Sequence, residues 1–133
     1  MSTNAIVYIR LKEEDKGKVL KFNPSLTKEA DRDSGNVRRE LNVENDIAII
    51  GAYVHWDGDT IIESLKEHFN DYDSALNLIL GGAMSYISDN IVRYYTSWRD
   101  EPYEVYKVKE TGKLKHKYIP CTYLFEDNQW KEL

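Results

Sequence analysis

The decapeptide GAYVHWDGDT, residues 51–60, places an imidazole, an indole and two carboxylates within a few positions of each other. His55 and Asp57 are two residues apart, and side chains at that spacing point to the same side of an extended segment. The pair could therefore meet one substrate as a general base and the group that orients it. The alternative is structural: His55 packs at a strand end, and Asp57 forms a turn with Gly58. An isolated His-x-Asp pattern favours the structural interpretation.

Trp56 makes the same decapeptide a candidate for binding. An indole stacks readily on a base or a sugar. The turn leads into an expected helix, whose free N–H groups would favour an anion. Asp59 and Glu63 compete for those N–H groups, which weakens the case for an anion at this point.

A second candidate is IVRYYTSWRDEPY, residues 91–103, in which arginines alternate with aromatic residues: Arg93, Tyr94, Tyr95, Trp98 and Arg99. Guanidinium groups bind phosphate and aromatic faces accept bases, so this composition is typical of a nucleotide site. The same residue types are enriched in protein–protein hot spots. An amphipathic strand with solvated arginines is the third interpretation. We expect ligand binding by His55, Trp56, Asp57, Arg93, Tyr94, Trp98 and Arg99.

Motifs of known catalytic or metal sites are missing from the sequence. There is no G-x-S-x-G, no H-E-x-x-H and no glycine-rich phosphate loop. His55, His68 and His116 are far apart, and Cys121 is the only cysteine. We therefore expect a protein without catalysis, cofactor or metal.

The elements that must position these residues follow from the hydrophobic pattern. The run IAIIGAYVH, residues 47–55, is apolar almost throughout and predicts an interior strand. Apolar residues at helical spacing predict a helix over 60–69, opened by a capping box of Thr60 and Glu63. A second helix should start at Asp73 or Ser74 and end at Gly81-Gly82.

The remaining segments predict strands. Residues 5–11 form the first, and KEEDKGK should turn the chain back as a hairpin into a strand over 19–22. Alternating segments after residue 90 add more strands. The order predicts an α+β fold, with two short helices packed on an antiparallel sheet.

At 133 residues the chain is expected to be a single domain, 1–133. Its least regular part is the polar segment 23–46, a loop or insertion with a short strand over 37–43. Arg38 and Arg39 lie in this loop, and we expect them to take no part in binding.

The net charge of −5 argues against direct DNA binding, which usually requires a basic surface. One cysteine suits a reducing compartment, no stretch approaches the roughly 20 apolar residues of a membrane span, and MSTNAIVYIR lacks the layout of a signal peptide. We expect a cytoplasmic protein. Ten Tyr and three Trp against three Phe are typical of subunit contacts and predict a homo-oligomer.

Three segments together, YVHWDG, LNLILGGAMSYIS and TYLFEDNQW, resemble a family of small phage and prophage proteins. That family carries a strand ending in His-Trp-Asp-Gly-Tyr-Pro, a Leu-Ile-x-Leu-Gly-Asp-Ile-Ser segment and a closing Tyr-Leu-Phe-x-x-x-x-Trp strand. This chain departs from the pattern at Asp59-Thr60, in place of Tyr-Pro, and at Gly82-Ala83, in place of Asp-Ile.

The resemblance implies a context rather than a reaction, since small phage accessory proteins commonly counter host immunity. The expected architecture is also similar to that of anti-Thoeris and anti-CBASS sponges. It implies a non-catalytic protein that sequesters a cyclic or ADP-ribose-type nucleotide signal in the host cytoplasm. One alternative is an anti-CRISPR-type inhibitor that blocks a host defence nuclease by protein contact. Another is a small hydrolase using His55 and Asp57.

Overall fold

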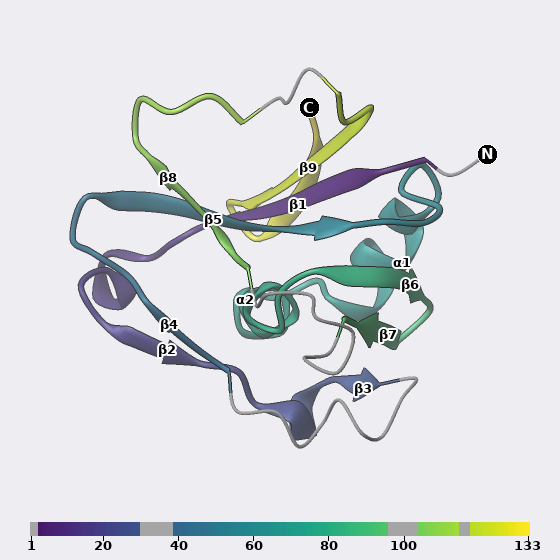
Figure 1. Cartoon of the computed structure of the whole chain (residues 1–133), viewed down its shortest axis with the longest axis horizontal. Helices are drawn as coiled ribbons and strands as arrows, with labels where there is room; N and C mark the ends of the chain where they lie inside the picture. Colours follow the sequence, from purple (N-terminus) through teal and green to yellow (C-terminus); the bar gives the residue numbers. More distant parts are fainter. Residues whose placement is uncertain (1–2, 30–38, 96–103, 115–117) are drawn as a thin grey trace.

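The computed structural model describes residues 3–29, 39–95, 104–114 and 118–133, which form a mixture of strands and two short α-helices (Figure 1). The predicted α+β class is confirmed. The described strands are β1 (Ala5–Arg10), β2 (Val19–Lys21), β3 (Lys28–Glu29), β4 (Glu40–Asn42), β5 (Ile47–Val54), β6 (Met84–Ser88), β7 (Ile91–Tyr94), β8 (Tyr106–Lys109), β9 (Cys121–Glu126) and β10 (Gln129–Glu132). The described helices are α1 (Ile61–His68), α2 (Tyr72–Leu80) and the short 3-10 turns η1 (Glu13–Asp15) and η2 (Pro24–Leu26).

The main sheet is mixed, not purely antiparallel as predicted. Its described strands run in the order β10-β9-β1-β5-β6-β7-β3, with β8 also paired to β5. β1 pairs antiparallel with β5 but parallel with β9, and β5 and β6 are parallel. The β5–β6 pairing follows from the connection, because two helices carry the chain back across the sheet before β6 begins.

β5 is the interior strand that its apolar sequence predicted. It pairs with β1 along one edge over Ile49–Val54. Its other edge is shared: β8 pairs with the first part, as far as Gly51, and β6 pairs at Val54. Ile50 is fully buried. β6 and β8 therefore diverge from each other at the end of β5.

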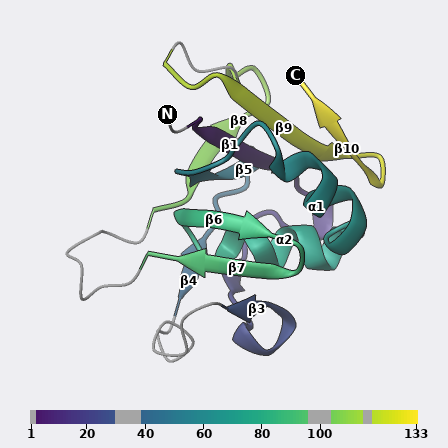
Figure 2. The ribbon, with the colours of Figure 1, turned by 90° about the vertical axis from the view of Figure 1, so that its right-hand side faces the viewer.

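Both helices cover the same face of this sheet (Figure 2). The core on that face combines alternate residues of β5 with the apolar stripes of the helices: Ile50, Ala52, Val54, Ile61, Leu65, Leu78 and Ile79. A smaller cluster on the opposite face contains Ile6, Tyr8 and Ile49. The two faces agree with the strand period of two, since Tyr53 and His55 then point away from the helices.

The helix ends differ in part from the sequence prediction. Thr60 is the N-cap residue of α1, but its side chain makes no capping bond; its hydroxyl donates instead to the carbonyl of Asp57 at 3.0 Å, so the predicted capping box does not form. Asp71, and not Asp73 or Ser74, caps α2 by accepting from the Ser74 N–H at 2.8 Å. The prediction that glycine ends α2 is confirmed, because Gly82 has a positive φ of 88°.

The predicted hairpin between the first two strands is wrong. β2 pairs with β4 in a separate two-stranded sheet. Both edges of β1 are already occupied, by β5 and by β9, so β1 has no edge left for β2.

The polar segment 23–46 is described at its two ends, which contain η2, β3 and β4. The expected strand over 37–43 corresponds to β4. Asn77 of α2 fastens the first end: its Oδ1 accepts from the Asn23 N–H at 2.8 Å, and its Nδ2 donates to the Asn23 carbonyl and the Thr27 hydroxyl. In the part of the chain that the structure describes, no helix is long and apolar enough to cross a membrane.

Candidate ligand-binding site

The end of β5 presents a stacked pair of aromatic rings. The rings of His55 and Trp56 lie 4.5 Å apart, centroid to centroid, with only 12° between their planes. Trp56 nevertheless keeps 44% of its surface exposed, which is unusual for so large an apolar side chain. His55 thus supports the indole while much of it stays open to solvent.

Two tyrosines fix the orientation of His55. A hydrogen bond of 2.6 Å joins Nδ1 of His55 to the hydroxyl of Tyr95. The ring of Tyr53 lies 5.9 Å from that of His55. Burial, followed by the proximity of Tyr95, raises the pKa of Tyr53, so its hydroxyl stays neutral near pH 7. We call Tyr53, His55, Trp56 and Tyr95 the aromatic platform.

The backbone explains why these four rings meet. The pairing of β5 with β6 continues past Val54: the His55 N–H donates to the Met84 carbonyl and the Trp56 N–H to the Ser85 carbonyl, both at 2.9 Å. β7 is the next strand, and the Tyr95 N–H, one residue after β7, donates to the Ala83 carbonyl at 3.0 Å. β6 thus sets the spacing between the two halves of the platform.

The Asp57-Gly58 turn is architectural. Asp57 has a positive φ of 57°, and its carbonyl accepts from both the N–H and the hydroxyl of Thr60 at 3.0 Å. Gly58 is pressed against the start of β1, where an added Cβ would come within 2.7 Å of the Ala5 Cβ. Its carbonyl accepts from the Tyr123 hydroxyl at 2.6 Å. The turn therefore anchors the loop that carries Trp56.

His55 and Asp57 do not form the base-and-orienter pair that their spacing allowed. The His55 ring is bonded to Tyr95, and Asp57 takes part in the turn through its backbone. This arrangement matches the structural interpretation of the His-x-Asp pattern.

The alternation of side chains along β7 places Arg93 and Tyr94, both in the second candidate 91–103, on opposite faces of the sheet. Arg93 is half-buried on β7, opposite Tyr86 of β6, on the face away from the helices. Tyr94 lies in the core instead, 2% exposed, with its hydroxyl donated to the Leu78 carbonyl at 2.7 Å. Trp98 and Arg99 fall outside the described residues.

The structure therefore brings His55 and Trp56 together with Tyr95, which belonged to the second candidate but not to the expected ligand-binding set, and with Tyr53, which the sequence did not single out. The strand period of two could have identified both tyrosines, because it places Tyr53 on the same face as His55 and Tyr95 on the same face as Arg93. Within the described strands β5, β6 and β7, Arg93 is the one cationic residue. This face is aromatic with little positive charge.

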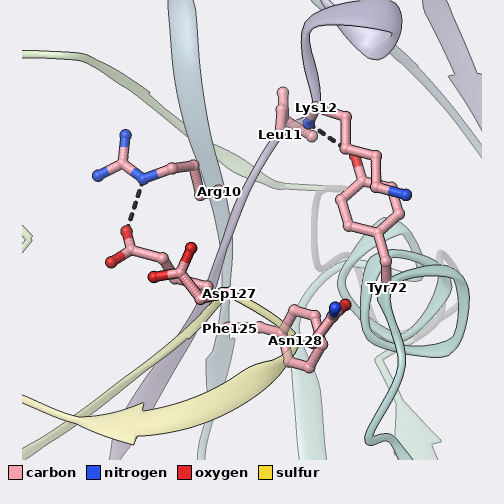
Figure 3. A pocket seen from close by; sticks show the side chains of 8 residues that line it. Arg10, Leu11, Lys12, Tyr72, Phe125, Asp127 and Asn128 are labelled. Atoms are coloured by element: carbon pink, nitrogen blue, oxygen red, sulfur yellow. Dashed lines mark hydrogen bonds and ion pairs between the residues drawn. The ribbon is translucent and has the colours of Figure 1, made fainter.

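A separate hollow of about 280 Å³ lies between the end of β1, the start of α2 and the β9–β10 turn (Figure 3). Arg10 and the acidic residues of its lining are paired: the Arg10 Nε donates to Glu126 at 2.6 Å, and Lys131 bridges Glu126 and Asp127. The Tyr72 hydroxyl accepts from the Lys12 N–H and donates to Asp15, and burial followed by this second bond raises the pKa of Tyr72. Tyr72 thus joins α2 to η1 at the edge of this hollow.

Among the described residues, no group of three His, Cys, Asp or Glu side chains is placed to bind a metal ion. Comparison with known protein families, with curated proteins and with solved structures found no match. The likeness to the phage family, and any function drawn from it, therefore stay predictions.

Proposed function

We propose that the protein is a non-catalytic binding protein that holds a nucleotide-derived signal against the aromatic platform. The observation that carries this proposal is the exposed indole of Trp56, stacked on an imidazole that Tyr95 fixes in place. Rigid, partly exposed aromatic surface is what a planar heterocycle binds best, because little side-chain freedom is lost on binding.

In this proposal the base of the ligand stacks on the open part of Trp56. The rings of Tyr53 and Tyr95 lie 5.9 and 6.2 Å from that of His55, and their hydroxyls are suited to the polar edge of a base or a ribose. Arg93, on the same face of the sheet, would contact a phosphate through its guanidinium group. The net charge of −5 repels a polyanion, so a ligand with few phosphates is favoured over a nucleic acid.

The biological role that we propose is phage counter-defence, in which the protein sequesters a cyclic or ADP-ribose-type immune signal in the host cytoplasm. The aromatic platform supports the binding step. The counter-defence context is supported only by the three sequence segments described above.

The test is a thermal-shift screen against cyclic mononucleotides, cyclic dinucleotides, ADP-ribose and adenosine, followed by calorimetric titration of the compound that raises the melting temperature most. Stacking of one base contributes about 1–3 kcal/mol, so Trp56→Leu should weaken binding roughly 5- to 150-fold. Trp56→Phe is the matched variant, since it keeps a planar ring and should retain most of the affinity.

Equal affinity of the parent and Trp56→Leu would place the site away from the platform. If no compound changes the melting temperature and the protein instead co-purifies with a host polypeptide, the inhibitor interpretation gains support. Heat-denatured protein that releases an intact small molecule would support the proposal directly.

A further inference from the structure

Arg39 is a buried arginine within the polar segment 23–46, just before β4. Its residue surface is only 4% exposed, although the sequence placed it in a polar loop and gave it no part in binding. Its Nη1 donates to the Gly81 carbonyl at 2.6 Å, and its Nη2 donates to the Tyr95 carbonyl at 3.1 Å. The guanidinium carbon also lies 5.2 Å from the ring centroid of Tyr94. A charge buried this deeply is tolerated only when such partners replace its water.

These bonds connect the turn after α2 to the end of β7. Tyr95 lies one residue beyond the strand, where ladder pairing no longer holds the backbone. Its N–H donates to the Ala83 carbonyl, and its own carbonyl accepts from Arg39. The backbone of Tyr95 is therefore held from two directions, by Ala83 at its N–H and by Arg39 at its carbonyl.

A continuous set of contacts connects Tyr95 to the exposed side chain of Trp56. Tyr95 is bonded to His55 at 2.6 Å, and the His55 ring stacks on Trp56 at 4.5 Å. A change at the backbone of Tyr95 would move its hydroxyl, because the rigid phenol ring carries a displacement of the backbone along its length. His55 would then lose the bond that sets its ring plane.

We infer that Arg39 is a positioning residue of the aromatic platform: it holds Tyr95 at the end of β7 and, through Tyr95 and His55, sets the plane of Trp56. The planar guanidinium group matters, since it reaches two carbonyls in fixed directions. A lysine ammonium on its single flexible stem lacks this fork. The inference depends on the proposed function only for its effect on binding.

The test uses the ligand-free protein, so it does not require the ligand to be known. The indole N–H resonance of Trp56 is assigned in a proton–nitrogen NMR spectrum by its loss in Trp56→Phe. It should shift in Arg39→Lys and also in Tyr95→Phe, because both changes release His55. Asn77→Ala is the matched control, since it removes another buried polar anchor of the same polar segment without touching Tyr95. Its Trp56 resonance should stay in place.

A folded Arg39→Lys protein with an unchanged Trp56 resonance would overturn the inference. Tyr95→Phe keeps it testable if Arg39→Lys fails to fold, because the ring volume is retained and only the hydroxyl is lost. An unchanged resonance in Tyr95→Phe would equally overturn it, since loss of the bond between Tyr95 and His55 would then have no effect at Trp56.

Ligand titration separates this inference from the proposed function. If a nucleotide binds the parent protein, we expect Tyr95→Phe to bind it several-fold more weakly while Asn77→Ala binds it normally at a temperature where it is folded. If no nucleotide binds the parent but the NMR shifts occur as expected, the proposed function fails and the positioning role of Arg39 stands.

Discussion

Gly58 carries a constraint that its neighbours in the His-Trp-Asp-Gly segment do not share. The Gly58 N–H donates to the carbonyl of Thr3 at 2.7 Å. The α-carbon of Gly58 faces Ala5 and leaves no room for a side chain. Asp57, one residue earlier, is exposed and uses its backbone. Within this short loop, Gly58 therefore anchors the chain, and Trp56 remains exposed to solvent.

We predict that Gly58→Ala destabilises the protein by about 1–3 kcal/mol, because the added methyl group overpacks the start of β1. Urea denaturation followed by circular dichroism would measure this change. Asp59→Ala, at the exposed neighbouring position, is the control and should stay within about 0.5 kcal/mol of the parent. Equal stability of the two variants would show that the turn can move away from β1.

Contacts between residues close in sequence were easier to predict than contacts between residues that only the fold brings together. His55 and Trp56 were correctly grouped because adjacent positions at a strand end must lie together. Tyr95 could not be paired with His55 from the sequence, since their contact depends on β6 lying between β5 and β7. The burial of Arg39 could not be predicted for a similar reason: its segment is polar, and the carbonyl that it bonds belongs to the turn after α2.

Among the elements, β5 shows what an apolar sequence pattern can and cannot predict. Its unbroken run predicted a strand buried on both faces, and this is what the structure has. The pattern did not predict the directions of its neighbours. Parallel pairing with β6 depends on the long helical connection, and the pairing of β1 with β9 depends on a segment at the far end of the chain. Hydrophobic period identifies a strand but not its partners.

We predict that Ile50→Asp costs at least about 3 kcal/mol of folding free energy, because it buries an unpaired carboxylate in the interior strand. Since small domains are typically stable by about 5–15 kcal/mol, the melting temperature should fall sharply. Val19→Asp, on the edge of the small β2–β4 sheet and 53% exposed in the parent, is the matched change and should have a minor effect. A parent-like melting curve for Ile50→Asp would contradict the position of β5.

At the scale of the whole molecule, the aromatic residues are distributed unevenly. Within the described ranges four Tyr and Trp side chains are buried: Tyr8, Tyr94, Tyr123 and Trp130. Others, including Tyr53 and Tyr95, remain half-buried on the outer side of the sheet. Half-buried aromatic surface of this kind is common at subunit contacts.

We predict that the protein forms a homo-oligomer in solution, with a closed symmetric arrangement as the usual outcome for small chains. Light scattering coupled to size exclusion should give a mass that is a multiple of 15.6 kDa at micromolar concentration. A mass of one chain over the whole accessible concentration range would refute this prediction.

The parallel pairing of β1 with β9 also has a consequence for how the chain folds. β1 leaves the ribosome well before β9, because the two strands lie far apart in the sequence. β1 can pair early with β5, but its second edge stays open until β9 has been made. Contacts of such long sequence separation slow folding, because a large loop is closed before the contact forms. During that interval β1 exposes a row of unpaired backbone groups to which β9 of another copy could add. Strand exchange between nascent chains is thus the error to which this topology is most exposed.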